Sequence, residues 1–255
     1  MIAHKLVLMM TKMNIAILGS GRMGLAVQRC IEAADDLVLA GCWSRSTPSG
    51  DLFSILSRAD VAIDFTLPGA TQEVVRATSE ANIPLVCGVS GLSKSTYQQL
   101  VAAGAKIPVL YDRNMSLGVA VLQRMVQMAG AALGDQFEAQ IQETHHVHKV
   151  DAPSGTALQL GEALAAARGQ VLGEVFHYDP ENNSAPESGQ IAFRSERRGE
   201  VRGEHTVFFG NASESLTLEH KVIDRGVFAD GALKAARWLV KQPPGFYSMQ
   251  DVVGQ

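Results

Sequence analysis

Short apolar runs alternate with helical stretches through the first 110 residues, and this alternation constrains the fold more than any other feature. Continuously apolar runs of this length are typical of strands that are covered on both faces. Between the first two runs, Met23, Val27, Cys30 and Ile31 recur at helical spacing. Repeated strand–helix units predict a parallel sheet with right-handed crossovers, which is a doubly wound α/β domain. The predicted strands are residues 14–18, 37–43, 61–65, 85–89 and 109–111, with a first helix over 22–34.

The pattern changes after residue 115. Leu216 and Leu218 alternate with Thr217 and Glu219, which indicates antiparallel strands in a sheet with one wet face. We therefore expect an α/β protein with a Rossmann-like doubly wound domain and a smaller α+β domain. The predicted helices are 119–130, 156–168 and 229–241, the strands are 137–143, 201–209 and 214–222, and the loop is 178–190.

Composition excludes several classes of protein. The 255 residues suffice for two modest domains, and a net charge of −4 with no long basic run gives nucleic-acid binding no electrostatic support. Cys30, Cys42 and Cys87 are widely spaced, which argues against a disulfide framework or a structural zinc and fits a reducing cytoplasm. The apolar run 6–10 is too short to span a bilayer, and no other segment predicts a membrane protein. We interpret residues 1–12 as a disordered extension or an incorrectly assigned start.

A GxGxxG pattern follows the first predicted strand and opens the first helix. It consists of Gly19, Ser20, Gly21, Arg22, Met23 and Gly24. In dinucleotide-binding domains the first glycine permits a tight turn, the second lets the backbone approach a pyrophosphate, and the third permits close helix–strand packing. The helix N-terminus then favours the anion. The alternative is a plain glycine-rich turn.

The end of the second predicted strand carries no acidic residue. NAD-binding domains commonly place Asp or Glu there to bond the ribose hydroxyls, whereas this chain has Ser44 and Arg45. Serine and arginine are better suited to a 2′-phosphate, which favours NADPH. The alternative is that Arg45 is a solvated surface residue.

A histidine–lysine segment carries the strongest chemical signal. His145, His146, His148 and Lys149 lie within five residues, and a helix then begins at Ser154, Gly155 and Thr156. Histidine can give or take a proton near neutrality, lysine can bind a carboxylate, and the helix start offers N–H groups to an anion. Together they predict a pocket for a small acidic substrate that is protonated during the reaction.

Two other interpretations of the histidines remain open. His146 and His148 fall on one side of an extended segment and could ligate a metal, but the sequence places no third ligand, and we predict no metal site. The histidines could also be surface residues without a role. For His148 alone, a structural or supporting role is favoured.

The run from Glu143 to Ala157 resembles the signature E-x-H-x-x-x-K-x-D-x-P-S-G-T-A of the 4-hydroxy-tetrahydrodipicolinate reductases, also called dihydrodipicolinate reductases. The similarity extends over nearly the whole chain from Met13. It includes the segments 21–24 (GRMG), 63–66 (IDFT), 88–91 (GVSG), 114–119 (NMSLGV), 203–206 (GEHT) and 228–232 (FADGA).

The resemblance implies an NAD(P)H-dependent reduction in lysine biosynthesis, acting on a cyclic dicarboxylate with NADPH or NADH. It also implies a homotetramer formed through the sheets of the second domain. The nucleotide-binding domain would comprise residues 13–113 and 225–255, and the substrate-binding and tetramerisation domain would comprise residues 114–224.

The resemblance also assigns roles to individual residues. His145 would be the catalytic proton donor, with Lys149 as its partner. Substrate binding would fall to His146, Ser154, Gly155, Thr156 and Arg225. The nicotinamide and ribose side of the cofactor would be lined by Gly88, Val89, Ser90, Arg113, Asn114 and Met115.

Two features depart from the family pattern. Many members carry an additional glycine at the position of Leu18. The stretch between Arg45 and Val61 is also short, which predicts that the helix after the second strand is missing.

Two rival functions are considered beside this one. Another two-domain dehydrogenase, such as an amino-acid dehydrogenase, would share the nucleotide-binding half but not the segment from His145 to Thr156. A cofactor-sensing regulatory protein would have no need for both His145 and Lys149, and the chain has no DNA-reading motif.

Overall fold

A computed structural model describes residues 12–45, 51–180 and 184–254. The chain divides into two compact units, one formed by the residues up to Asp112 with Ala229–Val252, and the other by Arg113–Phe228 with the residues from Val253. The expectation of a disordered extension concerns residues outside the described part, apart from Lys12. The same holds for residues 181–183 of the predicted loop.

The first unit contains a six-stranded parallel sheet in the order β11-β5-β4-β3-β1-β2. The chain places β2 on one side of β1 and then returns to place β3 on the other, so that the order reverses at β1. The five predicted strands are present, and β11 was not predicted because it has only three residues. The strands are β1 (Met13–Leu18), β2 (Leu37–Trp43), β3 (Val61–Asp64), β4 (Leu85–Cys87), β5 (Pro108–Tyr111) and β11 (Gly245–Tyr247).

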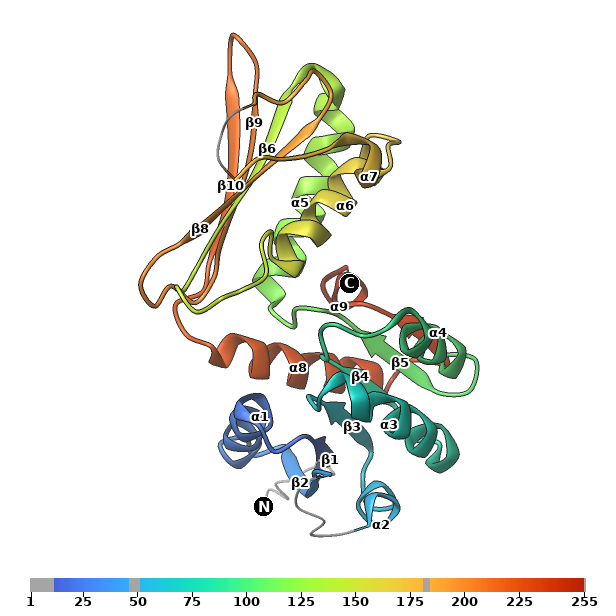
Figure 1. The fold of residues 1–255 in the computed structure, drawn as a ribbon. Helices are drawn as coiled ribbons and strands as arrows, with labels where there is room; N and C mark the ends of the chain where they lie inside the picture. Colours follow the sequence, from blue (N-terminus) through green and yellow to red (C-terminus); the bar gives the residue numbers. More distant parts are fainter. Residues whose placement is uncertain (1–11, 46–50, 181–183, 255) are drawn as a thin grey trace, which may run out of the picture. The chain divides into compact units, whose positions relative to one another are not determined.

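Helices cover both faces of this sheet (Figure 1). Ala16 and Leu18 of β1 join a core cluster with the buried residues of α2, α3 and α4, whereas α1 and α8 lie on the opposite face. This arrangement confirms the doubly wound α/β prediction. The helices are α1 (Arg22–Glu32), α2 (Leu52–Leu56), α3 (Pro68–Ala81), α4 (Lys94–Ala103), α8 (Gly226–Leu239) and α9 (Met249–Val253).

The prediction that no helix follows the second strand is wrong. The short helix α2 begins after Asp51, whose carboxylate accepts a hydrogen bond from the N–H of Phe53 at 3.2 Å. Leu52, Ile55 and Leu56 are buried against the sheet, so apolar packing stabilises a helix that is too short to be stable alone. Residues 46–50 of this segment lie outside the described residues.

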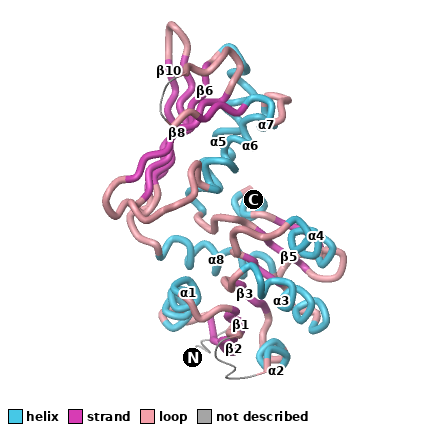
Figure 2. The backbone as a smooth tube through the Cα atoms, viewed as in Figure 1, coloured by secondary structure: helices cyan, strands magenta, loops and turns pink. Residues whose placement is uncertain are grey.

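The second unit contains a five-stranded mixed sheet in the order β10-β9-β6-β8-β7. β9 and β10 pair antiparallel as predicted, whereas β8 pairs parallel with both β6 and β7. β7 and β8 were not predicted. Helices α5 and α6 cover one face of the sheet (Figure 2). The elements are α5 (Leu117–Leu133), η1 (Gly134–Gln136), β6 (Glu138–His145), α6 (Gly155–Ala167), α7 (Leu172–Val175), β7 (Phe176–Tyr178), β8 (Ile191–Arg197), β9 (Glu204–Gly210) and β10 (Ser215–Lys221).

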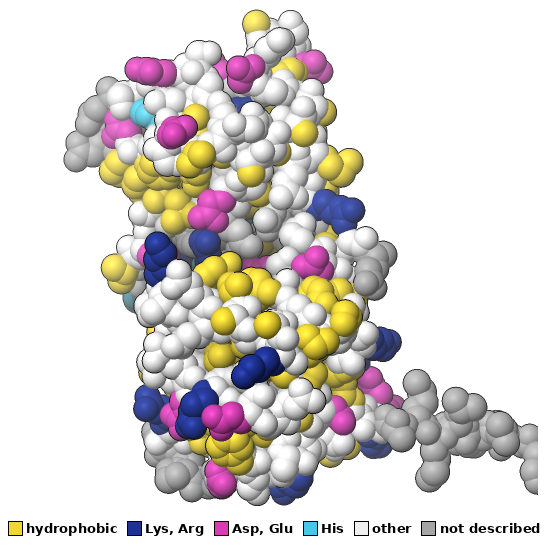
Figure 3. Space-filling view, turned by 90° about the vertical axis from the view of Figure 1, so that its right-hand side faces the viewer, with side chains coloured by type: hydrophobic (Ala, Val, Ile, Leu, Met, Phe, Trp, Pro, Cys, Tyr) yellow, Lys and Arg dark blue, Asp and Glu magenta, His cyan; other side chains and the backbone are white. Residues whose placement is uncertain are grey.

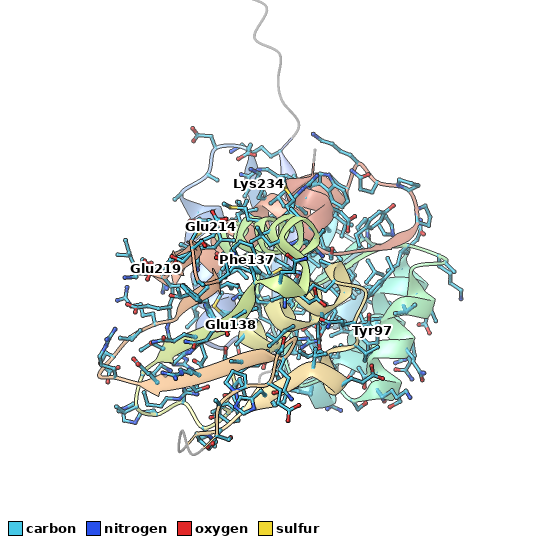
Figure 4. All side chains as sticks on the ribbon, turned by 90° about the horizontal axis from the view of Figure 1, so that it is seen from above. Tyr97, Phe137, Glu138, Glu214, Glu219 and Lys234 are labelled. Atoms are coloured by element: carbon cyan, nitrogen blue, oxygen red, sulfur yellow. The ribbon has the colours of Figure 1, made fainter. Side chains whose placement is uncertain are left out.

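The two faces of this sheet differ in polarity. Ile141 and Val207 join Leu160 of α6 in the core cluster of the unit. The opposite face is polar, and Glu138 at the start of β6 and Glu219 on β10 are both exposed (Figure 4). The predicted wet face is therefore present. On the side of the molecule drawn in Figure 3, hydrophobic and charged side chains are interspersed over each unit.

Among the described residues, one helical stretch, Leu117–Gln136, is long and apolar enough to cross a membrane. It comprises α5 and the turn that follows. Leu122 and Val126 of this helix belong to the core of the second unit, so we assign α5 as a core helix of that unit.

Candidate active site

The carboxyl end of β6 carries the centre of the candidate site. Side chains alternate along a strand, so Glu143 and His145 share the helix-covered face with Ile141 of the core. β6 is the middle strand of the sheet and pairs with β8 and β9 on its two sides. This central position fixes the backbone on which both side chains stand.

Glu143 is fully buried and forms an ion pair with Arg197 of β8. The guanidinium donates to its two carboxylate oxygens at 3.1 and 3.0 Å, and Nδ1 of His145 makes a short hydrogen bond to the same carboxylate. Burial by itself raises the pKa of Glu143, but the hydrogen bonds from His145, Arg197 and Ser195 outweigh it and hold the pKa at about 2. Glu143 is therefore a carboxylate near neutrality.

His145 has its second ring nitrogen beside Gly203. A Cβ atom at Gly203 would lie 3.2 Å from Nε2 of His145, and the backbone there has a φ of +148°, which favours glycine. Since Nδ1 is occupied by Glu143, Nε2 is the nitrogen through which His145 can exchange a proton with a ligand.

His205 of β9 packs against His145 edge to face, with ring centroids 5.3 Å apart and planes at 75°. Burial lowers the pKa of His205 to about 3, so its ring is neutral near pH 7. Nε2 of His205 lies 3.4 Å from Oγ of Ser154. His205 thus joins the sheet at His145 to the start of α6.

Lys149 lies on the loop that follows β6. Its Nζ is 2.7 Å from both carboxylate oxygens of Asp151, and its N–H donates to the carbonyl of His146 at 3.1 Å. Burial raises the pKa of Asp151, but the bonds from Lys149 outweigh it, and the net shift is downward. The loop therefore presents a cation whose position is fixed by a carboxylate two residues away.

The N-terminus of α6 has the features of an anion site. Oγ of Ser154 accepts a hydrogen bond from the N–H of Ala157 at 3.2 Å and caps the helix. A Cβ at Gly155 would meet no atom within 4 Å, so the first turn is open there. The hydroxyl of Thr156 accepts a bond from Nδ2 of Asn114 at 3.1 Å. Free N–H groups and the helix dipole favour a carboxylate at such a turn.

The remaining histidines of the segment differ in their surroundings. Nδ1 of His146 is buried, and no described residue bonds it. Burial and the nearby charge of Arg225 lower the pKa of His146. His148 is 75% exposed and lies 3.7 Å from a carboxylate oxygen of Glu200. No group of three or more potential metal ligands occurs among the described residues.

The glycine loop fits a nucleotide. Gly19 has a φ of +111°, and a Cβ at Gly24 would lie 1.9 Å from the carbonyl oxygen of Gly19, so α1 approaches the strand closely. A Cβ at Gly21 would meet no atom within 4 Å, and no described side chain caps α1. The first turn of α1 is therefore open to a pyrophosphate. Ser20 and Arg22 of the loop are exposed, and Met23 is half-buried.

Three loops meet at the carboxyl edge of the parallel sheet. A Cβ at Gly19 would lie 2.5 Å from the carbonyl oxygen of Phe65, and one at Gly88 would lie 2.3 Å from Cε1 of the same residue. After Gly88, Val89 is buried and Ser90 is exposed. Doubly wound sheets bind nucleotides at this edge, where the strand order reverses.

The other residues predicted for the cofactor have partners within their own units. Arg45 is 60% exposed, bonds the carboxylate of Glu73 at 3.3 Å and donates to the carbonyl of Gly69 at 3.1 Å. Arg113 forms an ion pair with Glu162 at 3.1 Å. Asn114 donates to Thr156, as described above. Ser44 is half-buried, and Met115 is buried.

Sequence reasoning assigned no role to four residues of this site. Glu143 could have been found, because it stands two residues before His145 on a strand and therefore on the same face. Asp151 lies in the signature and His205 in the segment 203–206, so the resemblance marked both positions without giving either a role. Arg197 had no such signal, since its position depends on how β8 pairs with β6.

Comparisons with known proteins agree over both units. The family model described as dihydrodipicolinate reductase, N-terminus, matches residues 13–115, and that described as dihydrodipicolinate reductase, C-terminus, matches residues 118–253. The 4-hydroxy-tetrahydrodipicolinate reductase of Caulobacter vibrioides is 43% identical over 94% of this chain and 97% of its own length. That of Halorhodospira halophila is 42% identical over 85% of this chain and 82% of its own.

Solved structures share the fold. A dipicolinate-bound dihydrodipicolinate reductase from Paenisporosarcina sp. TG-14 superposes with a TM-score of 0.77 at 21% identity, covering 95% of this chain and 100% of that one. A diaminopimelate dehydrogenase from C. glutamicum has a TM-score of 0.55 at 13% identity, covering 95% and 94%, and shares the fold alone. The two family models and the curated relatives establish that the chain belongs to the dihydrodipicolinate reductase family.

Proposed function

We propose that this chain reduces 4-hydroxy-tetrahydrodipicolinate to tetrahydrodipicolinate with NADH or NADPH, and that His145 donates the proton that completes the reaction. The observation that carries the assignment of His145 is its geometry. Glu143 holds Nδ1, so Nε2 is directed to the space beside Gly203. The chain is an NAD(P)H-dependent oxidoreductase of the diaminopimelate route to lysine.

The substrate is a cyclic imine dicarboxylate that loses water to become conjugated. A nicotinamide cofactor would supply a hydride at C4 of the ring, and electrons moving toward the ring nitrogen would leave an enamine. The enamine must then gain a proton at C3. His145 is suited to this step because histidine can be protonated near neutrality, and because Glu143 bonds Nδ1 and leaves Nε2 to exchange the proton.

Cationic and N–H groups in the same unit account for recognition of the carboxylates. Lys149 supplies a charge, and the turn at Ser154, Gly155 and Thr156 supplies N–H groups at the start of α6. Arg225 adds a second positive charge, and His146, whose pKa is lowered by burial and by Arg225, is available as a neutral hydrogen-bonding group. Holding the ring in one orientation contributes to the rate because the reacting atoms no longer have to find each other.

The cofactor is assigned to the first unit. The open first turn of α1 would hold the pyrophosphate, Gly88 and Ser90 would lie along the nicotinamide, and Ser44 with Arg45 would face the adenosine ribose. The resemblance also assigns Arg113, Asn114 and Met115 to the cofactor, and these three residues belong to the second unit. Among the described residues, the end of the second strand carries Ser44 and Arg45 in place of the usual acidic residue, so NADPH should be accepted at least as well as NADH.

Replacement of His145 tests the function directly. His145→Gln should lower kcat roughly 10²-fold or more, as for loss of a general acid, while KM changes less. The matched control is His148→Gln, because His148 is an exposed histidine three residues away. The assay follows NAD(P)H absorbance with enzymatically generated substrate. Unchanged kcat in folded His145→Gln would contradict the assignment.

We further propose that the protein is a cytoplasmic homotetramer formed through the outer face of the second sheet. The three cysteines are free thiols, as expected in a reducing compartment. Phe208 of β9, on the outer face of the sheet, is 37% exposed among polar neighbours. Mass measurement in solution, with Phe208→Glu as the disrupting variant, tests the assembly.

A further inference from the structure

We propose that Arg197 is a positioning residue that sets the placement of His145 and Lys149 relative to each other. It acts on His145 through Glu143 and on Lys149 through the backbone of the loop after β6. This inference rests on the proposed roles of His145 and Lys149. Arg197 makes no hydrogen bond to the side chain of His145 or of Lys149 among the described residues, so we class it as a positioning residue and not as a catalytic one.

The guanidinium of Arg197 uses all five of its N–H donors. Nη1 and Nη2 each donate to one oxygen of Glu143, at 3.1 and 3.0 Å. Nε donates to the carbonyl of Lys149 at 3.2 Å, and Nη2 donates to the carbonyl of Asp151 at 2.6 Å. The fifth donor, on Nη1, bonds the carbonyl of Glu196 at 2.7 Å. One planar group therefore fixes the carboxylate that holds His145 and the loop that carries Lys149.

The sheet register explains how one side chain reaches both. In the parallel pair of β6 and β8, Arg197 lies opposite His145, and Glu143 is two positions earlier on the same face. A long side chain at Arg197 can reach diagonally to Glu143. It can also reach forward to the loop, because that loop leaves β6 directly after His145.

A purely structural ion pair is the alternative interpretation. Removing two charges from water is costly, and a buried pair is often no better for stability than apolar residues of similar size. Glu143 is fully buried, and the side chain of Arg197 is 21% exposed. Two of the three remaining donors of Arg197 bond the carbonyls of Lys149 and Asp151 in the loop after β6, which favours a role in arranging the site.

Lysine cannot replace this arginine. A lysine ammonium has three donors at a single point, whereas the bonds of Arg197 spread over a planar fork. Arg197→Lys therefore keeps the charge but loses either the contact with Glu143 or the contact with the loop. A displacement of about 1 Å in a catalytic group can cost roughly a hundredfold in rate, and we expect kcat/KM to fall by about that factor.

The decisive measurement is a double-mutant cycle with His145→Gln. If Arg197 acts on His145 through Glu143, the kcat of the double variant should match that of His145→Gln alone, while the loss that runs through Lys149 remains visible in KM. General structural damage would instead add to the loss, and that result would overturn the proposal. The matched control is Arg198→Lys, because Arg198 is 62% exposed and pairs with Glu204 outside the site.

Binding of pyridine-2,6-dicarboxylate gives a second readout that needs no turnover. Titration calorimetry should show affinity about tenfold weaker in Arg197→Lys, because Lys149 is no longer held in place. This factor corresponds to about 1.4 kcal/mol. Unchanged affinity together with unchanged kcat in this variant would overturn the inference.

Glu143→Gln covers the case in which Arg197→Lys does not fold. An amide has one accepting oxygen in place of two, so Gln cannot accept from both guanidinium nitrogens of Arg197 and from His145 as the carboxylate does. We therefore expect kcat to fall in Glu143→Gln as it does in Arg197→Lys. An unchanged kcat in this variant would contradict the role of the pair.

Different results would overturn the proposed function and the positioning role of Arg197. Normal kcat in His145→Gln would overturn the proposed function. A large loss in His145→Gln combined with kinetics for Arg197→Lys and Glu143→Gln equal to those of Arg198→Lys would overturn the positioning role alone.

Discussion

His205 should make the second unit lose stability when the pH falls from 6.5 toward 5. Burial holds the pKa of this histidine at about 3, against an ordinary value of 6.5. Between these two values the unfolded chain binds a proton that the folded chain does not, so stability falls as the pH falls. The loss is complete near pH 3 and then amounts to about 5 kcal/mol, at about 1.4 kcal/mol for each pH unit.

The useful window for this measurement lies above pH 5. From pH 6.5 to 5.0, His205 alone should cost about 2 kcal/mol. Glu143 has the same sign, but its pKa is lowered from 4.5 to about 2, so its contribution is lost only below about pH 4.5. Asp64 acts in the opposite direction, because its pKa is raised to about 6, but it belongs to the first unit.

Amide hydrogen exchange in β6 and β9, corrected for the intrinsic effect of pH, reports on the second unit alone. His205→Gln keeps a side chain that can bond Ser154 but removes the titration. The variant should lose about 2 kcal/mol less than the parent between pH 6.5 and 5.0. The pKa values of His146 and His220 are also lowered, but both residues are present in either protein and cancel in the difference. Equal losses in parent and variant would refute the argument that His205 is buried in its neutral form.

Two further predictions concern ligands. Lys149→Ala should weaken competitive inhibition by pyridine-2,6-dicarboxylate about tenfold or more, because a charged hydrogen bond contributes about 1.5–3 kcal/mol; undiminished inhibition would place the carboxylates elsewhere. Arg45→Ala should lower kcat/KM for NADPH and not for NADH, by at most about tenfold since the side chain is 60% exposed and shares its donors with Glu73 and Gly69, and an equal loss for both cofactors would show that Arg45 does not bind the phosphate.

The first unit could be predicted closely from the sequence because its signals are local. Continuous apolar runs mark buried parallel strands, and the glycine spacing at Gly19 and Gly24 marks the close approach of helix and strand. The error at α2 has a physical cause. A helix of five residues would be unstable by itself, but α2 is stabilised by burial of Leu52, Ile55 and Leu56 against the folded sheet.

The second unit was harder to predict because its sheet is mixed. The alternation in Leu216 and Leu218 identified an antiparallel strand with one wet face. β8 ends in four residues, Arg194 to Arg197, that are all polar, so its second half gives no apolar signal. Its parallel pairing with β6 is a tertiary choice made possible by the crossover through α6.

The candidate site likewise has parts that follow from local sequence and parts that follow from strand pairing. His145, Lys149 and the helix start at Ser154 are contiguous in sequence, so their chemistry could be inferred together. Arg197 lies 48 residues beyond Lys149 and bonds its carbonyl, and 54 residues beyond Glu143 and bonds its carboxylate. The sequence around Arg197 does not predict these partners, because they depend on the register of β8 on β6. A contiguous motif can supply reactive groups, but their spacing depends on a backbone that several distant segments build together. A residue that sets this spacing can therefore be identified only once the strand pairing is known. Replacing such a residue should change the relative positions of the reactive side chains while leaving the sequence of the motif unchanged.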